Sequence, residues 1–204
     1  MHLEYHNLKE FYFDPITHIG GWYIPDDICD GVIDFFHSEK DNWISGSKRL
    51  DTDQNIFIDR NWKQSTELHL MTSDDGIQFY LKHLGNVLEM YKKKYPFSDI
   101  VQHYKIEAGM KIQYYGPGEG FYEWHSENDG FKTVQKRHLV FMTYLNTLEN
   151  AGTEFSHQSI TTPCQKGLTI IWPVAWTHTH RGVVNHVGHK YIATGWYVFD
   201  EGEN

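Results

Sequence analysis

Three residues of this sequence have the types and the order needed to hold a metal ion: His125, Glu127 and His180. Two imidazoles and one carboxylate form the facial triad that binds non-heme Fe(II) and leaves coordination positions open for substrate and oxygen. The chain contains 14 histidines, so a His-X-Glu sequence alone can arise by chance. The interpretation therefore depends on whether the surrounding residues also fit such a site.

His125 and Glu127 stand two residues apart, and we expect them to lie in one strand. Side chains two apart on a strand share a face, so both can reach one ion. A hydrogen-bonded core histidine is the ordinary alternative for a lone imidazole. Glu127 argues against that alternative, because a carboxylate buried without a cation is costly. Asp129 is a weaker substitute, since it requires the strand to continue undistorted.

The distal part of the pattern offers two histidines, His178 and His180, which we expect on one face of a strand. On the residue pattern alone, either can complete the triad. Lys190 follows in a strand expected to pair with the His180 strand across a turn at Gly188. A lysine directed into an apolar barrel needs an anion to face. A dicarboxylate bound to the metal would supply that anion.

Strands are the elements expected to position these residues. Gly, Pro and Asn turn residues divide the chain into short apolar segments from about residue 104 onward. Short antiparallel strands in this number favour a sandwich or a barrel. The expected strands are 105–106, 110–115, 121–125, 139–146, 153–157, 168–172, 177–184 and 190–199.

Two helices are expected before the strands. The first follows a short strand at 20–24 and is capped by Asp26 or Asp27. The second opens at Ser73, carries an apolar stripe, and stops at Pro96. The sequence thus predicts a mainly β protein whose N-terminal helices pack against an antiparallel barrel.

The length fits one domain over residues 1–204. Within it we expect 1–100 to give helical and loop support and 101–200 to form the barrel core. The mixed, polar segment 39–72 is expected to form long loops with short strands, and is a candidate lid over the site.

Composition limits the classes of partner. The formal net charge of −9 argues against strong, non-specific binding of nucleic acid. The two cysteines, Cys29 and Cys164, have no metal-type spacing and are expected as free thiols in a reducing compartment. We find no signal-peptide pattern and no apolar run of transmembrane length, so a cytoplasmic protein without membrane association is expected.

The segment 114–197 resembles the Fe(II)/2-oxoglutarate-dependent dioxygenases, and within them the small bacterial and phage members of the prolyl 4-hydroxylase-like group. The most specific block runs from His180 to Trp196, with the family's spacing between histidine, lysine and tryptophan. The matching positions are Tyr122, His125, Glu127, Arg137, Tyr144, Gly152, Pro163, Gly167, Trp172, Pro173, His180, Gly182, Lys190 and Trp196.

The resemblance implies a double-stranded β-helix, the jelly-roll or cupin-like barrel, with helical support. It implies Fe(II), 2-oxoglutarate and O2 as cofactors and co-substrates, with ascorbate as an optional addition. The metal ligands would be His125, Glu127 and His180. The spacing to Lys190 selects His180 as the distal ligand, and His178 is retained as its neighbour or alternative.

The resemblance also implies roles around the metal. Lys190 would pair with the distal carboxylate of 2-oxoglutarate, and a tyrosine hydroxyl would add a second donor. Tyr115 is our first choice for that donor and Tyr122 the second. Arg137 and Trp196 would line the substrate channel.

Glu127 departs from the family pattern, which usually has Asp at this position. Both carboxylates are hard oxygen ligands suited to Fe(II), and the strand must accommodate one additional methylene. Related halogenases have a small residue at this position, where chloride binds the iron. A carboxylate at Glu127 therefore favours hydroxylation.

The resemblance implies a peptidyl proline as substrate, with 39–72 as a lid over an extended peptide. A free amino acid or small metabolite is the alternative substrate. Oxidative demethylation of nucleic-acid bases is disfavoured, because that family grips 2-oxoglutarate with arginine and this chain offers Lys190. A non-enzymatic cupin-type barrel that binds a metal or small ligand is a further alternative. The sequence indicates no oligomeric state.

Overall fold

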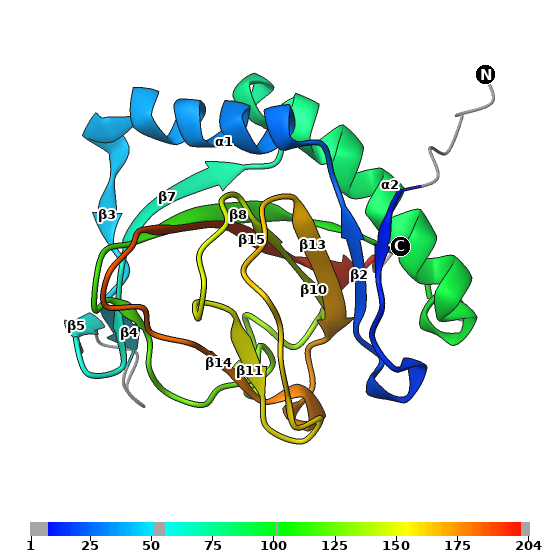
Figure 1. The fold of residues 1–204 in the computed structure, drawn as a ribbon. Coiled ribbons are helices and arrows are strands. Elements are labelled where there is room, and N and C mark those ends of the chain that lie inside the picture. Colours follow the sequence, from blue (N-terminus) through cyan, green and yellow to red (C-terminus); the bar gives the residue numbers. More distant parts are fainter. Residues whose placement is uncertain (1–7, 51–55, 101, 201–204) are drawn as a thin grey trace.

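The computed structural model describes residues 8–50, 56–100 and 102–200, with helices gathered on one side of two facing sheets (Figure 1). Part of the candidate lid, residues 51–55, lies outside the described residues. No helix in the described ranges is long and apolar enough to cross a membrane.

A large antiparallel sheet forms the backbone of the molecule. Four of its strands come from the N-terminal half, which supplies more than helices and loops. In spatial order the strands are β1 (Glu10–Phe11), β2 (Gly20–Tyr23), β13 (Leu168–Pro173), β10 (Arg137–Tyr144), β15 (Lys190–Phe199), β8 (Tyr104–Tyr115), β7 (Thr66–Met71) and β3 (Ile44–Ser45).

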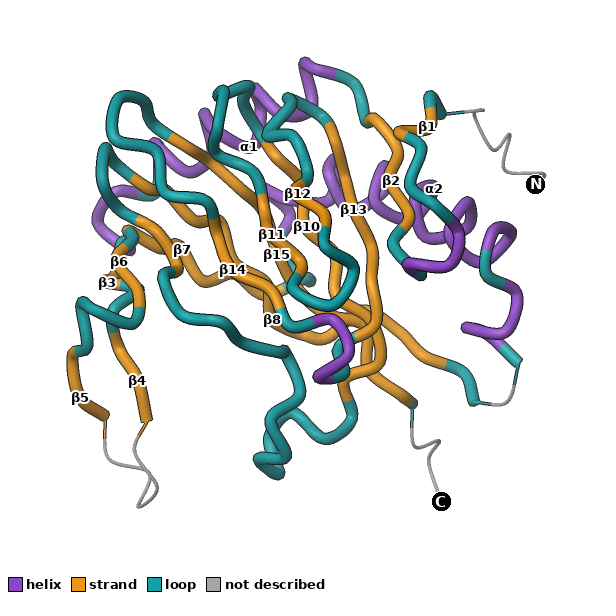
Figure 2. Tube along the Cα trace, turned by 60° about the horizontal axis from the view of Figure 1, so that its bottom comes forward, coloured by secondary structure: helices purple, strands orange, loops and turns teal. Residues whose placement is uncertain are grey.

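A smaller sheet lies across the large one and closes the barrel (Figure 2). Its strand order is β12 (Ile160–Thr161), β11 (Thr153–Phe155) and β14 (His180–Gly182). Two short pairs flank it, namely β4 (Lys48–Leu50) with β5 (Ile56–Ile58), and β6 (Lys63–Gln64) with β9 (Gly120–Phe121). Two facing antiparallel sheets of this kind form a jelly roll, so the predicted double-stranded β-helix is confirmed.

Two long helices cover the outer face of the large sheet: α1 (Asp26–Ser38) and α2 (Gln78–Lys94). Asp26 is in the first turn of α1 and Pro25 is its cap, so the expected aspartate cap was wrong. A short 3₁₀ helix (Asp75–Ile77) precedes α2, which therefore begins later than the expected start at Ser73. The other 3₁₀ helices are Pro15–Thr17, Lys40–Asn42, Pro96–Asp99 and Trp176–His178.

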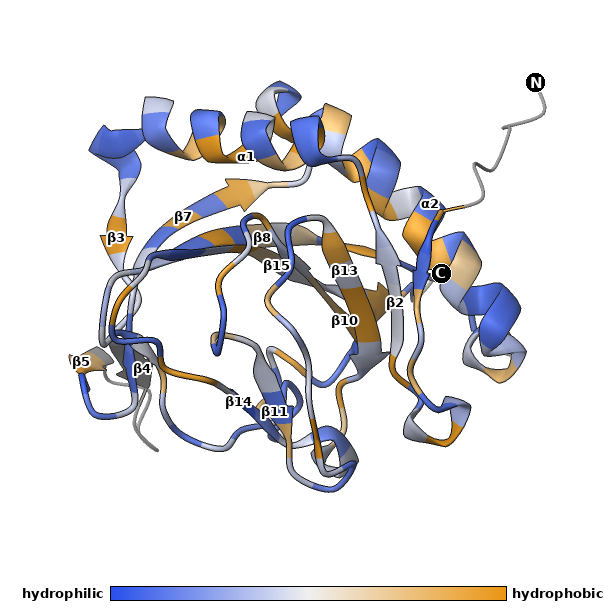
Figure 3. Ribbon diagram, viewed as in Figure 1, coloured by the Kyte–Doolittle hydropathy of each residue, from blue (hydrophilic) through white to orange (hydrophobic). Residues whose placement is uncertain are grey.

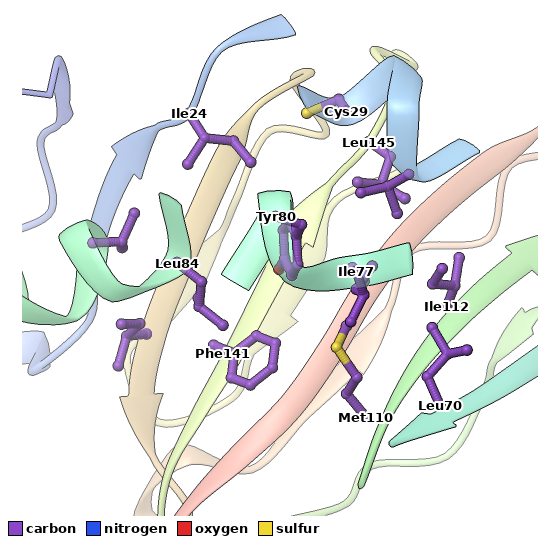
Figure 4. Packing of buried hydrophobic residues seen from close by; sticks show 14 of the residues in the cluster. Ile24, Cys29, Leu70, Ile77, Tyr80, Leu84, Met110, Ile112, Phe141 and Leu145 are labelled. Atoms are coloured by element: carbon purple, nitrogen blue, oxygen red, sulfur yellow. The ribbon is translucent and has the colours of Figure 1, made fainter. Parts of the chain in front are cut away.

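Two apolar cores share the strands of the large sheet. The first lies between sheet and helices, where Tyr80 and Leu84 of α2 pack toward Phe141 of β10 (Figure 4). The second lies between the two sheets and contains the adjacent residues Val140 and Met142. Successive residues of a strand point to opposite faces, so β10 serves both cores. This explains its continuous apolar sequence and the apolar colour of the central strands in Figure 3.

Three expectations about strands near the site were wrong. The strand expected at 121–125 ends at Phe121, and the residues after it form a loop. The segment expected as one strand at 177–184 divides into the 3₁₀ helix Trp176–His178 and the short strand β14. β14 pairs with β11, whereas β15 pairs with β8 and β10, so the His180 and Lys190 strands lie in different sheets.

Candidate active site

His125 and His180 face each other through their main chains. Residue His125 forms an isolated antiparallel bridge with His180, with N–H···O distances of 3.0 and 2.9 Å in the two directions. Two residues later, the Glu127 N–H donates to the Val174 carbonyl at 3.2 Å. Backbone hydrogen bonds to His180 of β14 and to Val174, directly after β13, thus hold the loop that carries His125 and Glu127, although the loop is not itself a strand.

The side chains of His125, Glu127 and His180 converge on one point. Each histidine Nε2 lies 3.5 Å from Oε1 of Glu127. One ligand atom from each residue lies within 4.8 Å of the other two, which is close enough to share one ion. Two imidazole nitrogens and one carboxylate oxygen are the donor set preferred by non-heme Fe(II).

Main-chain carbonyl groups fix the ring orientation of both histidines. His125 Nδ1 is 3.0 Å from the Glu123 carbonyl, and His180 Nδ1 is 2.9 Å from the His178 carbonyl. A carbonyl only accepts, so each Nδ1 carries the proton and each Nε2 keeps a lone pair for a metal. Burial, together with the neighbouring His180, lowers the pKa of His125 and favours the neutral, coordinating form.

Aromatic rings enclose both imidazoles. Phe121 stacks on His125 at a centroid distance of 3.6 Å. Trp172 meets His180 edge-on at 5.1 Å, and Phe155 lies 5.5 Å from the same ring. These contacts restrict ring rotation and keep the site apolar around its polar atoms.

The second carboxylate oxygen of Glu127 has its own partners. Trp196 Nε1 donates to Oε2 at 2.9 Å, and Arg137 Nη1 lies 3.9 Å from the same oxygen. The Arg137 guanidinium also stacks on the Trp196 ring at 3.5 Å. Burial alone would raise the pKa of Glu127, but interactions with the two histidines lower it well below its usual value. The carboxylate is therefore ionised and presents Oε1 to the histidines.

Lys190 lines the same cavity and is paired with Tyr115 in the β15–β8 register. Its side chain is buried, and Nζ donates to the carbonyls of Ala151 at 3.1 Å and Val183 at 3.4 Å. Burial lowers its pKa to about 8. No carboxylate of the described residues forms an ion pair with this ammonium. A buried cation without an anion fits the distal carboxylate of 2-oxoglutarate.

One cavity of about 1030 Å³ joins these groups. The triad, Lys190, Tyr115, Arg137 and Trp196 all line it. Tyr122 does not line it, and its hydroxyl donates to the Gly118 carbonyl at 2.9 Å. Of the two tyrosines considered from the sequence, the structure brings only Tyr115 to the cavity.

His178 is oriented differently from the sequence expectation. It ends a 3₁₀ helix, and its Nε2 lies 2.9 Å from the Thr17 carbonyl. Its imidazole thus contacts the N-terminal segment, while its main-chain carbonyl orients the ring of His180. The expectation that both histidines share a strand face was wrong, because the chain becomes helical before β14.

Sequence reasoning missed a polar group at the cavity wall. Lys63 and Gln113 line the cavity, and both contact the buried Glu67 of β7. Lys63 and Glu67 lie in the segment 39–72, which was expected to form long loops with short strands, so they had no assigned neighbours. The alternation of Leu68 and Leu70 with polar residues was the available indication of a strand.

Comparison with known proteins gives one match to a family model. Residues 110–198 match the family model described as the 2OG-Fe(II) oxygenase superfamily. This range contains all three residues of the triad together with Lys190. No curated protein matches the chain.

Solved structures of prolyl hydroxylases share the fold. A viral collagen prolyl hydroxylase from Paramecium Bursaria Chlorella virus-1, in complex with 2OG, has a TM-score of 0.64 at 20% identity, covering 88% of this chain and 95% of that one. A prolyl hydroxylase from Trichoplax adhaerens, in complex with a hypoxia inducible factor peptide fragment, has a TM-score of 0.66 at 12% identity, covering 89% and 84%. A Pseudomonas putida prolyl-4-hydroxylase has a TM-score of 0.61 at 11% identity, covering 89% and 92%.

These findings confirm the resemblance identified from the sequence: residues 110–198 match the 2OG-Fe(II) oxygenase superfamily, and the chain has the fold of the solved prolyl hydroxylases. The match to this superfamily implies Fe(II), 2-oxoglutarate and O2 as cofactors and co-substrates, and the His-Glu-His triad offers three ligand atoms for the metal.

Proposed function

We propose that the protein hydroxylates a peptidyl proline at the site formed by His125, Glu127 and His180. The observation that carries the proposal is one cavity lined by both a three-donor metal site and the buried Lys190 ammonium. When bound, iron with 2-oxoglutarate and O2 supplies the oxidising power for C–H hydroxylation and releases succinate and CO2.

The residues of the chain would bind and orient the metal and 2-oxoglutarate. The two Nε2 atoms and Glu127 Oε1 would hold the metal on one face, with Trp196 and Arg137 fixing the other carboxylate oxygen. Lys190 would pair with the distal carboxylate of 2-oxoglutarate in a charge-assisted hydrogen bond. Because Glu127 supplies a carboxylate where a halogenase needs space for halide, hydroxylation is the expected outcome.

Arg137 and Trp196 were expected to line the substrate channel. Both line the cavity, but their shortest polar contacts are with Glu127 and, for Arg137, with Glu107 at 3.2 Å. We therefore assign them first to positioning the carboxylate. Their contact with substrate remains part of the proposal.

The mouth of the cavity supports a peptide substrate. Phe57, Trp124 and Phe131 line it while remaining between 41% and 44% exposed. Exposed aromatic rings at a groove are typical of sites that bind extended, proline-containing segments. Two of the similar structures are described as a collagen prolyl hydroxylase and a prolyl hydroxylase with a bound peptide fragment.

The direct test combines anaerobically purified protein with Fe(II), 2-oxoglutarate, O2 and proline-containing peptides. Succinate is measured together with a peptide mass increase of one oxygen. We expect a mass shift on proline. A shift on free amino acids but on no peptide would refute the peptidyl substrate and favour a small-molecule hydroxylase.

Site assignment is tested by paired variants. His180→Ala and Glu127→Ala should abolish turnover and Mn(II) binding, because each removes one of three ligands. His178→Ala is the matched control and should keep Mn(II) binding, since its imidazole contacts Thr17. Metal loss in His178→Ala but not in His180→Ala would exchange the two assignments. Lys190→Met should raise the 2-oxoglutarate KM sharply while leaving Mn(II) affinity unchanged.

A further inference from the structure

A buried carboxylate outside the metal site has no role in the function proposed above. Glu67 of β7 is 3% exposed and accepts five contacts. Oε1 accepts from Lys63 Nζ, from Ser65 Oγ at 3.2 Å and from Gln113 Nε2 at 2.9 Å, and Oε2 contacts His69 Nε2 at 2.8 Å and Lys111 Nζ at 3.5 Å.

Glu67 is ionised in this setting. Burial alone would raise its pKa, but the Lys63 ammonium, the bond with His69 and the charge of Lys111 lower it well below its usual value. An ionised carboxylate can only accept hydrogen bonds. Every group directed at Glu67 must therefore present a proton.

This requirement fixes the amide of Gln113. A glutamine amide has a donating and an accepting end, and the donating Nε2 must face Glu67. Its oxygen Oε1 consequently faces Tyr115, whose hydroxyl donates to it at 3.0 Å. The proton of the Tyr115 hydroxyl is thus directed at Gln113. Glu67 determines this direction, because it fixes the orientation of the Gln113 amide.

Tyr115 is the last residue of this chain of hydrogen bonds, and it lines the cavity together with Lys190. It is buried and pairs with Lys190 in the β8–β15 register. The Lys190 ammonium lies 5.0 Å from the centroid of its ring. A displaced or rotated Tyr115 would therefore change the surroundings of that ammonium directly.

We propose that Glu67 is a positioning residue for 2-oxoglutarate, acting through Gln113 to hold the ring and hydroxyl of Tyr115 beside Lys190. The inference rests on the proposed role of Lys190. In the structure the Tyr115 hydroxyl donates to Gln113. The expected role of Tyr115 as a second donor to 2-oxoglutarate, beside Lys190, stays a prediction.

The test interrupts the chain of hydrogen bonds at Gln113. Gln113→Leu leaves Tyr115 without its acceptor, while Glu67 keeps Lys63 and its other donors. 2-Oxoglutarate binding is measured calorimetrically in the absence of O2 with Mn(II) bound. We expect the Kd to rise about 3- to 10-fold, the factor that corresponds to one net hydrogen bond, with Mn(II) affinity unchanged.

Two further variants separate positioning from general damage. Gln113→Asn keeps an amide but shortens its reach, and it should also raise the Kd for 2-oxoglutarate. This variant replaces Gln113→Leu in the test if Gln113→Leu folds poorly. His69→Ala removes a half-exposed partner of Glu67 that does not belong to the chain of hydrogen bonds from Glu67 through Gln113 to Tyr115. This variant should leave 2-oxoglutarate affinity unchanged. Thermal unfolding of each variant reports the structural cost separately.

The decisive measurement is a double-mutant cycle with Tyr115→Phe, which lacks the hydroxyl. In that background, Gln113→Leu should cause no further loss of 2-oxoglutarate affinity. Wild-type affinity in Gln113→Leu, or an equal loss with and without the Tyr115 hydroxyl, would overturn the inference. If wild-type protein with Mn(II) does not bind 2-oxoglutarate at all, the proposed function fails as well, so the two failures are distinguishable.

Discussion

Trp196→Phe tests how this site uses a glutamate in place of the usual aspartate. The indole Nε1 donates to Glu127 Oε2 at 2.9 Å, which leaves Oε1 at 3.5 Å from both histidine Nε2 atoms. Phenylalanine retains an aromatic face for the Arg137 guanidinium, now stacked at 3.5 Å, but has no donor. The longer glutamate side chain would then lose the contact that directs Oε1 toward the metal.

The magnitude follows from the charge on the acceptor. A hydrogen bond to an ionised group contributes about 1.5–3 kcal/mol, and removing a partner of a metal ligand typically weakens metal binding about 10- to 100-fold. Arg137 remains 3.9 Å from Oε2 and limits the loss. We therefore expect an approximately 10-fold weaker Mn(II) Kd in Trp196→Phe, near the lower end of that range.

Anaerobic titration with Mn(II), followed by calorimetry or electron paramagnetic resonance, measures this effect without turnover. Trp43→Phe is the matched control, because its indole donates to the Phe36 carbonyl at 2.9 Å away from the cavity. Both variants lose one indole hydrogen bond, but only Trp196→Phe should lose metal affinity. A Kd within twofold of wild type for Trp196→Phe would refute the reasoning that Trp196 orients Glu127.

The structure supports three other predictions. The buried Lys190 has a pKa of about 8 against a usual 10.5, so 2-oxoglutarate affinity should fall about tenfold per pH unit above pH 8 as the ammonium deprotonates. Between pH 8 and 10.5, Lys190 binds more protons in the unfolded chain than in the folded one. Its contribution to the stability of the ligand-free protein should therefore rise with pH across that window. Denaturant titrations of wild type and Lys190→Met at several pH values measure this contribution. Gly152→Ala should destabilise the fold by about 3 kcal/mol, because a Cβ there would lie 1.6 Å from the Thr162 carbonyl oxygen, whereas Gly85→Ala in α2 meets nothing within 4 Å and should stabilise by about 1 kcal/mol. Equal midpoints for the two glycine variants in denaturant would contradict this.

Much of the barrel was predictable because its strands are bounded by local turn residues. β15 matches its expected range of 190–199, and β13 exceeds the expected 168–172 by one residue. β7 was not predicted as a strand of the large sheet. It pairs with β3 and with β8, and β8 lies about forty residues further along the chain, so the environment of β7 is set by tertiary contacts.

The candidate site was predictable where chemistry depends on residue type and spacing. The three triad residues and Lys190 were identified in this way, and the structure places them in one cavity. The loop conformation of His125 was not predictable, since its pairing with His180 is a long-range main-chain contact. The bond between Glu67 and Gln113 also joins residues far apart in sequence and has no local pattern.

The main-chain bridge between His125 and His180 has a consequence for altering the site. Its two hydrogen bonds use only N–H and carbonyl groups, which every residue except proline provides. Side chains at both positions can therefore be exchanged while the bridge itself is retained. The main chain sets the spacing between the two ligand positions, and the side chains set which donor atoms they offer. The scaffold is therefore suitable for designing sites with other metal preferences.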